Sequence, residues 1–208
     1  MSECPLKKPS LVPFVARWEG ERLAPESDLM VQMGPAGIRL GYKVESPEDR
    51  TGNVLWARVE QKPGTGRPEY AEMHPGRQYL AMFTMKCQVC GLPASRNKDG
   101  WLFLDWRKSY DPPTWPERSL TAMPPLCDTH VHTAVEECPH LRGTDFVTLR
   151  VRSPRLWGYS GTAYTLTANG WMTHQHEALL RLSDPNLRGI LATRLIRELR
   201  NVTVVDTS

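Results

Sequence analysis

The stretch KCQVCGLPAS, residues 86–95, places Cys87 and Cys90 with two residues between them. A second pair with the same spacing, Cys127 and His130, follows after a gap of 36 residues. Zinc prefers four thiolate or imidazole ligands in a tetrahedron, and a two-residue spacing lets both members of a pair reach one ion. The sequence therefore predicts one structural Zn²⁺ ion held by Cys87, Cys90, Cys127 and His130.

Two other interpretations of the first cysteine pair stay open. A redox pair of the thioredoxin type lies at a strand-to-helix junction, but Gly91, Leu92 and Pro93 follow here and initiate a helix poorly. Two buried, inert thiols would leave the spacing of Cys127 and His130 as a coincidence. The sequence therefore favours a metal site over both alternatives.

The identity of the fourth ligand also has alternatives. His132, Cys138 and His140 lie close to His130 in CDTHVHTAVEECPHL, residues 127–141. His130 is favoured because its spacing from Cys127 repeats the spacing of the first pair. We expect His132 to be a polar surface residue of a helix, while Cys138 and His140 could serve a second metal or cap that helix.

The segments around the two pairs predict the order of a treble-clef zinc finger over residues 85–141. The turn-like SRNKDG, 95–100, precedes GWLFLDW, 100–106, which mixes aromatic and aliphatic residues as strands do. The segment THVHTAVEEC, 129–138, is expected to be a short helix that ends near a proline. The proline-rich 111–125 is expected to be a loop.

The rest of the chain predicts an α+β fold. We expect an irregular segment at 1–28 and one domain at 29–208, with mixed β-structure at 29–61 and 144–168 on either side of the finger. A short helix is expected within 67–85. Within the same range, His74-Pro75-Gly76 is expected to form an exposed turn. Ser183-Asp184-Pro185 resembles a helix start. The apolar spacing after it predicts a C-terminal amphipathic helix through Leu187, Ile190, Leu191, Leu195 and Leu199.

Composition narrows the class of protein. Of the 208 residues 40% are apolar and 24% charged, as in soluble globular proteins, and the net charge is only +3. The amino terminus lacks a signal-peptide core, and no stretch approaches the roughly 18 apolar residues of a membrane-spanning helix. We therefore expect a cytoplasmic protein with no membrane contact, in which five cysteines are metal ligands or free thiols.

Catalytic motifs give little support to an enzyme. The chain has no G-x-S-x-G elbow, phosphate-binding loop, H-E-x-x-H or dinucleotide fingerprint. An HNH nuclease needs a histidine in its hairpin, and 94–110 has none, although His132 or His140 could stand in for its last histidine. A degenerate nuclease and a modifying enzyme of specialised metabolism, with the tryptophan-rich 101–115 as a pocket, are the alternatives.

A closed zinc site without a catalytic set favours a non-enzymatic binding module, regulatory or accessory, that contacts nucleic acid or a protein. Arginines recur in 150–155 and 194–200, where a helix would gather the second group toward one side. Basic side chains of this kind can bind phosphates. The candidate nucleic-acid contacts are Arg150, Arg152, Arg155, Arg194, Arg197 and Arg200.

The strings GRPEYAEMHPGRQYLAMFTMKCQVCGLPA, PPLCDTHVHTAVEECPHLRG and LATRLIRELRNVTVVD also carry a resemblance. With the rest of the chain from about Gly37 onward, they resemble a group of uncharacterised actinobacterial proteins of similar length. The second pair of that group is usually C-x2-C, so the resemblance implies that His130 replaces a cysteine ligand. It implies no activity.

Overall fold

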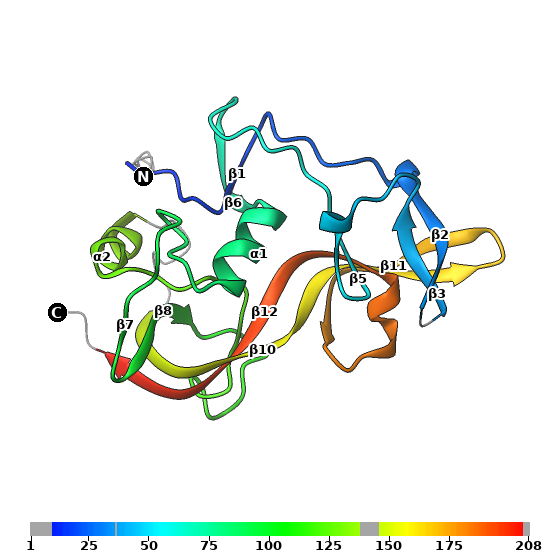
Figure 1. Cartoon of the computed structure of the whole chain (residues 1–208). Helices are drawn as coiled ribbons and strands as arrows, with labels where there is room; N and C mark the ends of the chain where they lie inside the picture. The colour runs from blue at the N-terminus through cyan, green and yellow to red at the C-terminus, as the bar shows by residue number, and fades with distance from the viewer. Residues whose placement is uncertain (1–9, 36, 138–145, 206–208) are drawn as a thin grey trace, which may run out of the picture.

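Two long antiparallel strands dominate the computed structural model, which describes residues 10–35, 37–137 and 146–205 (Figure 1). Strand β10, Phe146–Thr167, pairs with β12, Ile190–Val205, from Thr148 opposite Val205 to Ala163 opposite Ile190. Figure 1 shows the two strands running side by side through the whole molecule. The expected α+β class is confirmed, with strands as the main component.

Shorter strands extend this pair into an eight-stranded sheet. Its order is β4-β5-β12-β10-β8-β7, while β11 pairs with β10 and β9 pairs with β12. All these pairings are antiparallel except that of β5 with β12, which is parallel. The added strands are β4 Arg50–Thr51, β5 Val54–Trp56, β7 Arg96–Asn97, β8 Gly100–Trp106, β9 Leu120–Thr121 and β11 Gly170–Arg181.

The two halves of strand β10 pair with different strands. Residues 146–151 pair with β8, whereas residues 158–167 pair with β11. The register with β12 shifts near Gly158 and Gly161, where an added Cβ would lie 1.9 Å from the Leu180 carbonyl oxygen and 2.1 Å from that of Leu191. These glycines let the neighbouring backbones approach at irregularities of the strand.

Several elements surround the sheet. Strand β1, Ala16–Trp18, pairs with β6, Pro68–Met73, and β2, Leu29–Gly34, pairs with β3, Gly37–Tyr42. The segment expected to be irregular at 1–28 therefore contains a short strand, and its first nine residues lie outside the described part. The helices are α1 Pro75–Phe83 and α2 Asp128–Glu137, with 3₁₀ turns η1 Glu26–Asp28, η2 Pro47–Asp49 and η4 Pro185–Gly189.

The molecule has two differently built ends. We call the metal end the part made of 86–92, β7, β8, residues 126–137 with α2, and residues 146–151 of β10. Its buried cluster consists of Cys87, Leu102, Leu104, Leu126 and Val131. We call the hairpin end the part made of β2, β3, β5, η4, β11, residues 158–167 of β10 and residues 190–196 of β12. Its buried residues include Leu40, Tyr42, Leu55, Tyr164, Ile190 and Leu191.

The predicted C-terminal amphipathic helix is wrong. Its start is correct, because Asp184 accepts a hydrogen bond from the Asn186 backbone at 2.8 Å and Pro185 opens a helical turn, but that turn ends at Gly189. Residues 190–205 form β12 instead. From Ile190 to Leu199 both faces of β12 are largely buried, so its apolar residues lack the alternation of a half-buried strand and by chance match a helical repeat.

The strand also separates the arginines that a helix would have gathered. Alternate residues of a strand point to opposite faces, so Arg197 faces away from Arg194 and Arg200. The predicted single basic stripe of three arginines is therefore wrong.

The predicted exposed turn at His74 is also wrong, although the helix that follows it is confirmed. His74 is 1% exposed and caps α1, since its Nδ1 accepts from the backbone N–H of Gly76 at 3.1 Å and of Arg77 at 3.4 Å. Arg77 is buried as well, and both its terminal nitrogens donate to the Glu21 carboxylate at 2.6 Å. This ion pair attaches the amino-terminal segment to α1.

Candidate metal centre

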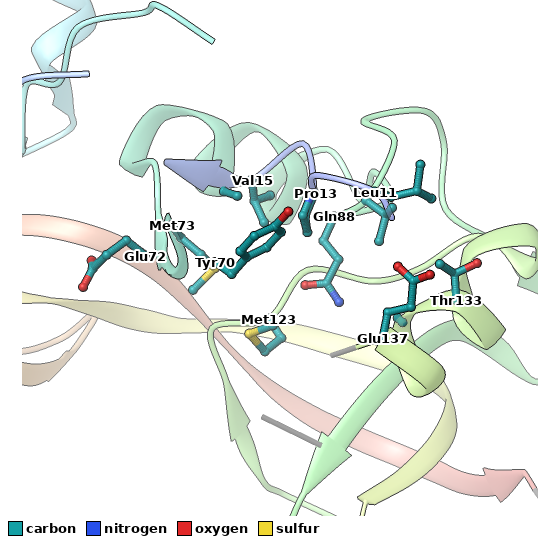
Figure 2. Close-up of a pocket in the computed structure, with 13 residues that line it drawn as sticks. Leu11, Pro13, Val15, Tyr70, Glu72, Met73, Gln88, Met123, Thr133 and Glu137 are labelled. Atoms are coloured by element: carbon teal, nitrogen blue, oxygen red, sulfur yellow. The ribbon is translucent and has the colours of Figure 1, made fainter. Parts of the chain in front are cut away.

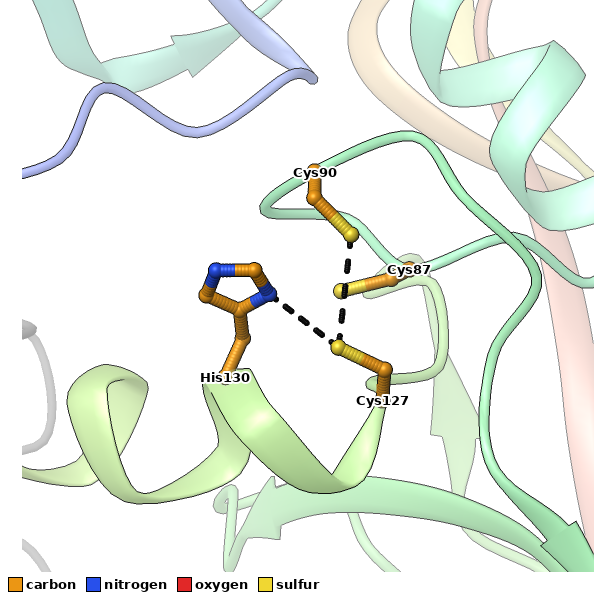
Figure 3. A group of neighbouring side chains, drawn as sticks. All are labelled: Cys87, Cys90, Cys127 and His130. Atoms are coloured by element: carbon orange, nitrogen blue, oxygen red, sulfur yellow. Dashed lines mark hydrogen bonds between the residues drawn. The ribbon is translucent and has the colours of Figure 1, made fainter.

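Four side chains from two distant segments converge at the metal end (Figure 3). The sulfur atoms of three cysteines and a ring nitrogen of the histidine all lie within 4.8 Å of one another. The Sγ atoms of Cys90 and Cys127 are 4.0 Å apart, and Cys127 Sγ is 3.1 Å from His130 Nδ1. A tetrahedral zinc site with Zn–S bonds of about 2.3 Å has edges of about 3.8 Å. The predicted set Cys87, Cys90, Cys127 and His130 therefore lies together at a spacing that suits one metal ion.

The first pair lies on a tight turn. The Cys87 backbone N–H donates to the Leu92 carbonyl at 2.7 Å, and the Gly91 N–H donates to the Cys87 carbonyl at 2.8 Å. The Val89 N–H lies 3.4 Å from Cys87 Sγ and donates to it. Gly91 has φ +71°, a conformation that favours glycine. The glycine after the second cysteine is thus required by the turn that directs both sulfurs to one point.

The second pair lies at the start of α2. The Cys127 carbonyl accepts from the His130 N–H at 3.1 Å and the Val131 N–H at 3.2 Å, so His130 occupies the first turn. Just before it, the Leu126 N–H donates to the Leu102 carbonyl of β8 at 2.8 Å. The hairpin 96–106 and the helix at 128–137 therefore confirm the predicted elements and hold both ligand pairs against one strand.

The surroundings of the ligands are apolar. Cys87 is 0% exposed, and Leu102, Leu104 and Leu126 lie in the same buried cluster. Burial raises the pKa of the Cys87 thiol to about 11, because a thiolate is unfavourable in such surroundings without a compensating charge. A divalent cation would supply that charge. Three sulfurs and one imidazole fit Zn²⁺ better than the harder ions Mg²⁺ or Ca²⁺.

The amino-terminal segment covers this centre, which the sequence did not indicate. The backbone N–H groups of Phe14 and Val15 donate to the carbonyls of Val89 at 2.8 Å and Gln88 at 3.2 Å. The Phe14 ring lies so close to the turn that a Cβ on Gly91 would be 3.0 Å from it. Contacts across more than seventy residues leave no local sequence signal.

The same segment also reaches the end of α2. The backbone N–H and hydroxyl of Ser10 donate to the Glu137 carboxylate at 2.7 and 2.6 Å. The segment 10–15 therefore touches both elements that carry metal ligands.

The arginines proposed to contact nucleic acid in the first group make contacts within the protein. Arg150 donates to Ser95 Oγ at 2.9 Å and to the Asp128 carboxylate at 3.0 Å, so it joins the hairpin turn to α2. Arg152 pairs with Asp99 at 3.2 Å and remains exposed. Arg155 is exposed and donates to Ser153 Oγ at 3.3 Å. Arg150 thus has a structural role in the finger.

The arginines of the second group, 194–200, also differ in burial and in their contacts. Arg197 is 9% exposed and donates to the carbonyls of Met82 and Phe83, which satisfies the last turn of α1. Arg200 pairs with Glu198 at 2.6 Å. Arg194 is half-buried and lines a cavity of about 280 Å³ beside Arg17 and His176. In a helix Arg194, Arg197 and Arg200 would lie on one side, but in the strand they lie in different surroundings.

The structure also bears on the alternative metal ligands and on the tryptophan-rich segment that was considered as a pocket. His132 is exposed on α2 and does not belong to the cluster, as expected for a surface residue. Cys138 and His140 lie outside the described residues. In the tryptophan-rich segment, Asp105 is 0% exposed and accepts from Trp115 Nε1 at 3.1 Å and Lys108 Nζ at 2.6 Å. These contacts fold the segment onto itself.

No protein-family model, curated protein or solved structure matches this chain. Neither described helix has the length and apolar content needed to cross a membrane.

Proposed function

We propose that the protein is a zinc-stabilised, non-catalytic binding module of treble-clef type. The observation that carries this proposal is the convergence of Cys87, Cys90, Cys127 and His130 within 4.8 Å. The order of turn, hairpin and ligand-bearing helix supports the treble-clef assignment. A structural zinc with four protein ligands leaves no position for a reacting water, whereas a catalytic zinc keeps one open.

A protein is the partner that the surface favours. At the hairpin end β2, β3, β10 and β11 expose apolar side chains, among them Met33 at 77% and Met172 at 56% exposure. The Trp171 indole donates to the Met30 carbonyl at 3.1 Å, which joins the two hairpins into one surface. Exposed apolar patches on soluble proteins commonly mark interaction sites. We define the hairpin surface as Met30, Val31, Met33, Ile38, Leu166 and Met172.

The closed character of the metal site can be tested by replacing zinc with Co²⁺. Its visible spectrum should indicate a four-coordinate thiolate site and stay unchanged when azide is added. The variant His130→Gly is the positive control, because loss of the imidazole opens a coordination position that azide or imidazole can fill. An azide-dependent spectrum in the unmodified protein would overturn the structural assignment and favour the nuclease alternative.

The partner class can be tested with the same protein. Binding to duplex DNA and to RNA should be undetectable at low salt, where phosphate contacts are strongest. Cross-linking in cells should capture a protein with the unmodified chain but not with Met33→Glu/Met172→Glu. Leu92→Glu is the matched control, because Leu92 is 64% exposed but lies at the metal end. Salt-sensitive nucleic-acid binding, with capture unaffected by the double substitution, would contradict this choice.

A further inference from the structure

A small apolar cavity lies beside the metal centre, between the amino-terminal segment, β6, the first ligand turn and α2 (Figure 2). Its volume is about 120 Å³. Val15, Met73 and Val89 contribute to its walls, together with Met123 and Ala134. An apolar cavity of about 150 Å³ binds benzene in another protein, so this somewhat smaller space suits at most one aromatic ring.

One polar side chain faces this apolar space without a partner. Gln88 is 7% exposed, and its carboxamide makes no hydrogen bond within the described residues. Figure 2 shows that carboxamide directed between Met123 and Glu137 into the cavity. The amide nitrogen and oxygen of Gln88 are not fully enclosed, so they meet solvent through the cavity, and a ligand there would displace that water. A ligand with a complementary donor and acceptor would satisfy the amide.

The walls and the rim restrict the chemistry of that ligand. Met73 and Met123 are soft, polarisable groups that pack well on aromatic rings. Glu72 and Glu137 lie at the same cavity, and Glu137 already accepts from Ser10. The Glu72 carboxylate points away from the cavity, but that of Glu137 lies near Gln88 and disfavours a carboxylate or phosphate on the ligand (Figure 2). The site therefore suits an uncharged molecule.

We propose that this cavity binds a small, single-ring aromatic molecule with an uncharged group that both donates and accepts a hydrogen bond, as a carboxamide does. The ring lies among the methionines, and the polar group pairs with the Gln88 carboxamide. This goes beyond the proposed function, which assigns no small ligand to the chain.

The cavity depends on the metal centre for its shape. Gln88 and Val89 lie between the first two ligands, while Thr133 and Ala134 follow His130 on α2. Metal and ring are therefore expected to stabilise each other through linkage, while the contacts to the ring come from the cavity walls.

The test is a binding series followed by NMR on the ¹⁵N-labelled, zinc-loaded full chain. Benzamide should bind with a Kd of about 1 mM or tighter and shift the Gln88 side-chain amide resonances. Benzoate, which has the same ring and size but a negative charge, should bind at least about tenfold more weakly, a difference of about 1.4 kcal/mol. Equal affinities for benzamide and benzoate would overturn the proposal. The absence of benzamide binding at about 10 mM, the highest probe concentration, would also overturn it.

Matched variants assign the site. Gln88→Met keeps the length and removes the amide, so it should weaken benzamide binding about tenfold, as expected for one lost hydrogen bond. Thr133→Phe should block the cavity, whereas Thr129→Phe makes the same change at an exposed position of α2 outside it. Unchanged binding in both Gln88→Met and Thr133→Phe would contradict the site.

Zinc content, measured on every variant, separates this proposal from the metal proposal. If the zinc-loaded Gln88→Met protein loses benzamide affinity, the ligand site is supported on its own. If the unmodified protein holds zinc but ignores benzamide, only the ligand proposal fails. If it binds no zinc at all yet still binds benzamide through Gln88, the ligand proposal stands and the metal proposal fails.

Discussion

The two ends of the molecule share strands β10 and β12 but are held together by different chemistry. At the hairpin end, the buried Tyr42 side chain is held by hydrogen bonds within the protein. The Tyr42 hydroxyl donates to the Trp56 carbonyl at 3.1 Å and accepts from the Arg58 N–H at 2.9 Å. At the metal end, by contrast, the ligand atoms of three cysteines and a histidine mainly face one another. Packing and hydrogen bonds complete the first end, whereas the ligand cluster of the second is suited to a cation.

This difference follows from what each segment can bury. Isoleucine, leucine and tyrosine side chains from several strands fill the hairpin end, which therefore has an apolar core of its own. At the metal end the ligands pack on a smaller cluster that includes Cys87, while Phe103, Leu149 and Val151 of the same strands belong to a separate cluster. Short segments with little core are commonly stabilised by a structural metal.

The largest expected effect is that of metal removal. Structural zinc sites contribute on the order of 10 kcal/mol, so chelation should unfold the metal end locally. Hydrogen exchange followed by mass spectrometry should show lost protection at 87–91 and 127–131. Residues 190–196 of β12 should keep theirs, since the hairpin core stays intact. Uniform loss of protection along the chain would contradict the independence of the two ends.

A smaller effect should follow from breaking the buried ion pair. Arg77→Ala leaves the Glu21 carboxylate, which is 0% exposed, without its partner, at a cost of about 3–5 kcal/mol in the free energy of unfolding. Denaturant unfolding would measure it. Arg67→Ala removes an exposed arginine that lies 3.7 Å from Glu19, and it should leave stability unchanged. Equal effects of both substitutions would show that burial of the pair is unimportant.

The same carboxylate should give stability a pH dependence. Burial acts to raise the pKa of Glu21, but hydrogen bonds from Arg77 and two backbone N–H groups outweigh it and lower the pKa from 4.5 to about 2. The contribution, about 3 kcal/mol, is complete above pH 4.5 and disappears as the pH falls toward 2.

Comparison with Glu21→Gln isolates this carboxylate from acid release of the metal. The unmodified protein should be the more stable of the two at pH 6, and its advantage should vanish near pH 2. An advantage that persists without change at low pH would contradict the lowered pKa.

The smallest expected effect compares single core residues at the two ends. Ile190→Val removes one methylene group from the hairpin end and should cost about 1 kcal/mol without changing zinc affinity. Val131→Ala at the metal end should lower both stability and zinc affinity, because Val131 packs in the cluster that includes Cys87. Competition with a zinc chelator measures affinity. Equal zinc affinities of the two variants would remove the distinction between the ends.

Local spacing was enough to predict the metal end. A two-residue ligand spacing, a turn before GWLFLDW and a short helix each depend on nearby residues, and the structure has all three. The C-terminal strand could not be predicted in this way. Its conformation depends on pairing with β10, which is distant in sequence, and burial on both faces hides the alternation that marks a strand.

Features formed between distant segments were missed for the same reason. The segment His74-Pro75-Gly76 resembled an exposed turn because Glu21, the partner that buries the neighbouring Arg77, lies 56 residues before that arginine. Arg197 resembled a surface arginine because the helix end that it caps is 114 residues away. Neither partner leaves a mark near the residue itself, so composition and spacing alone assign such arginines to the surface.

Zinc-edge X-ray absorption of the purified protein tests the central claim most directly. We predict one zinc ion per chain with three sulfur neighbours at about 2.3 Å and one nitrogen neighbour at about 2.0–2.1 Å. His130→Ala should lose the nitrogen neighbour, whereas His132→Ala, which removes an exposed histidine of the same helix, should leave the spectrum unchanged. A protein that retains no zinc, or a zinc ion with fewer than three sulfur neighbours, would contradict the account.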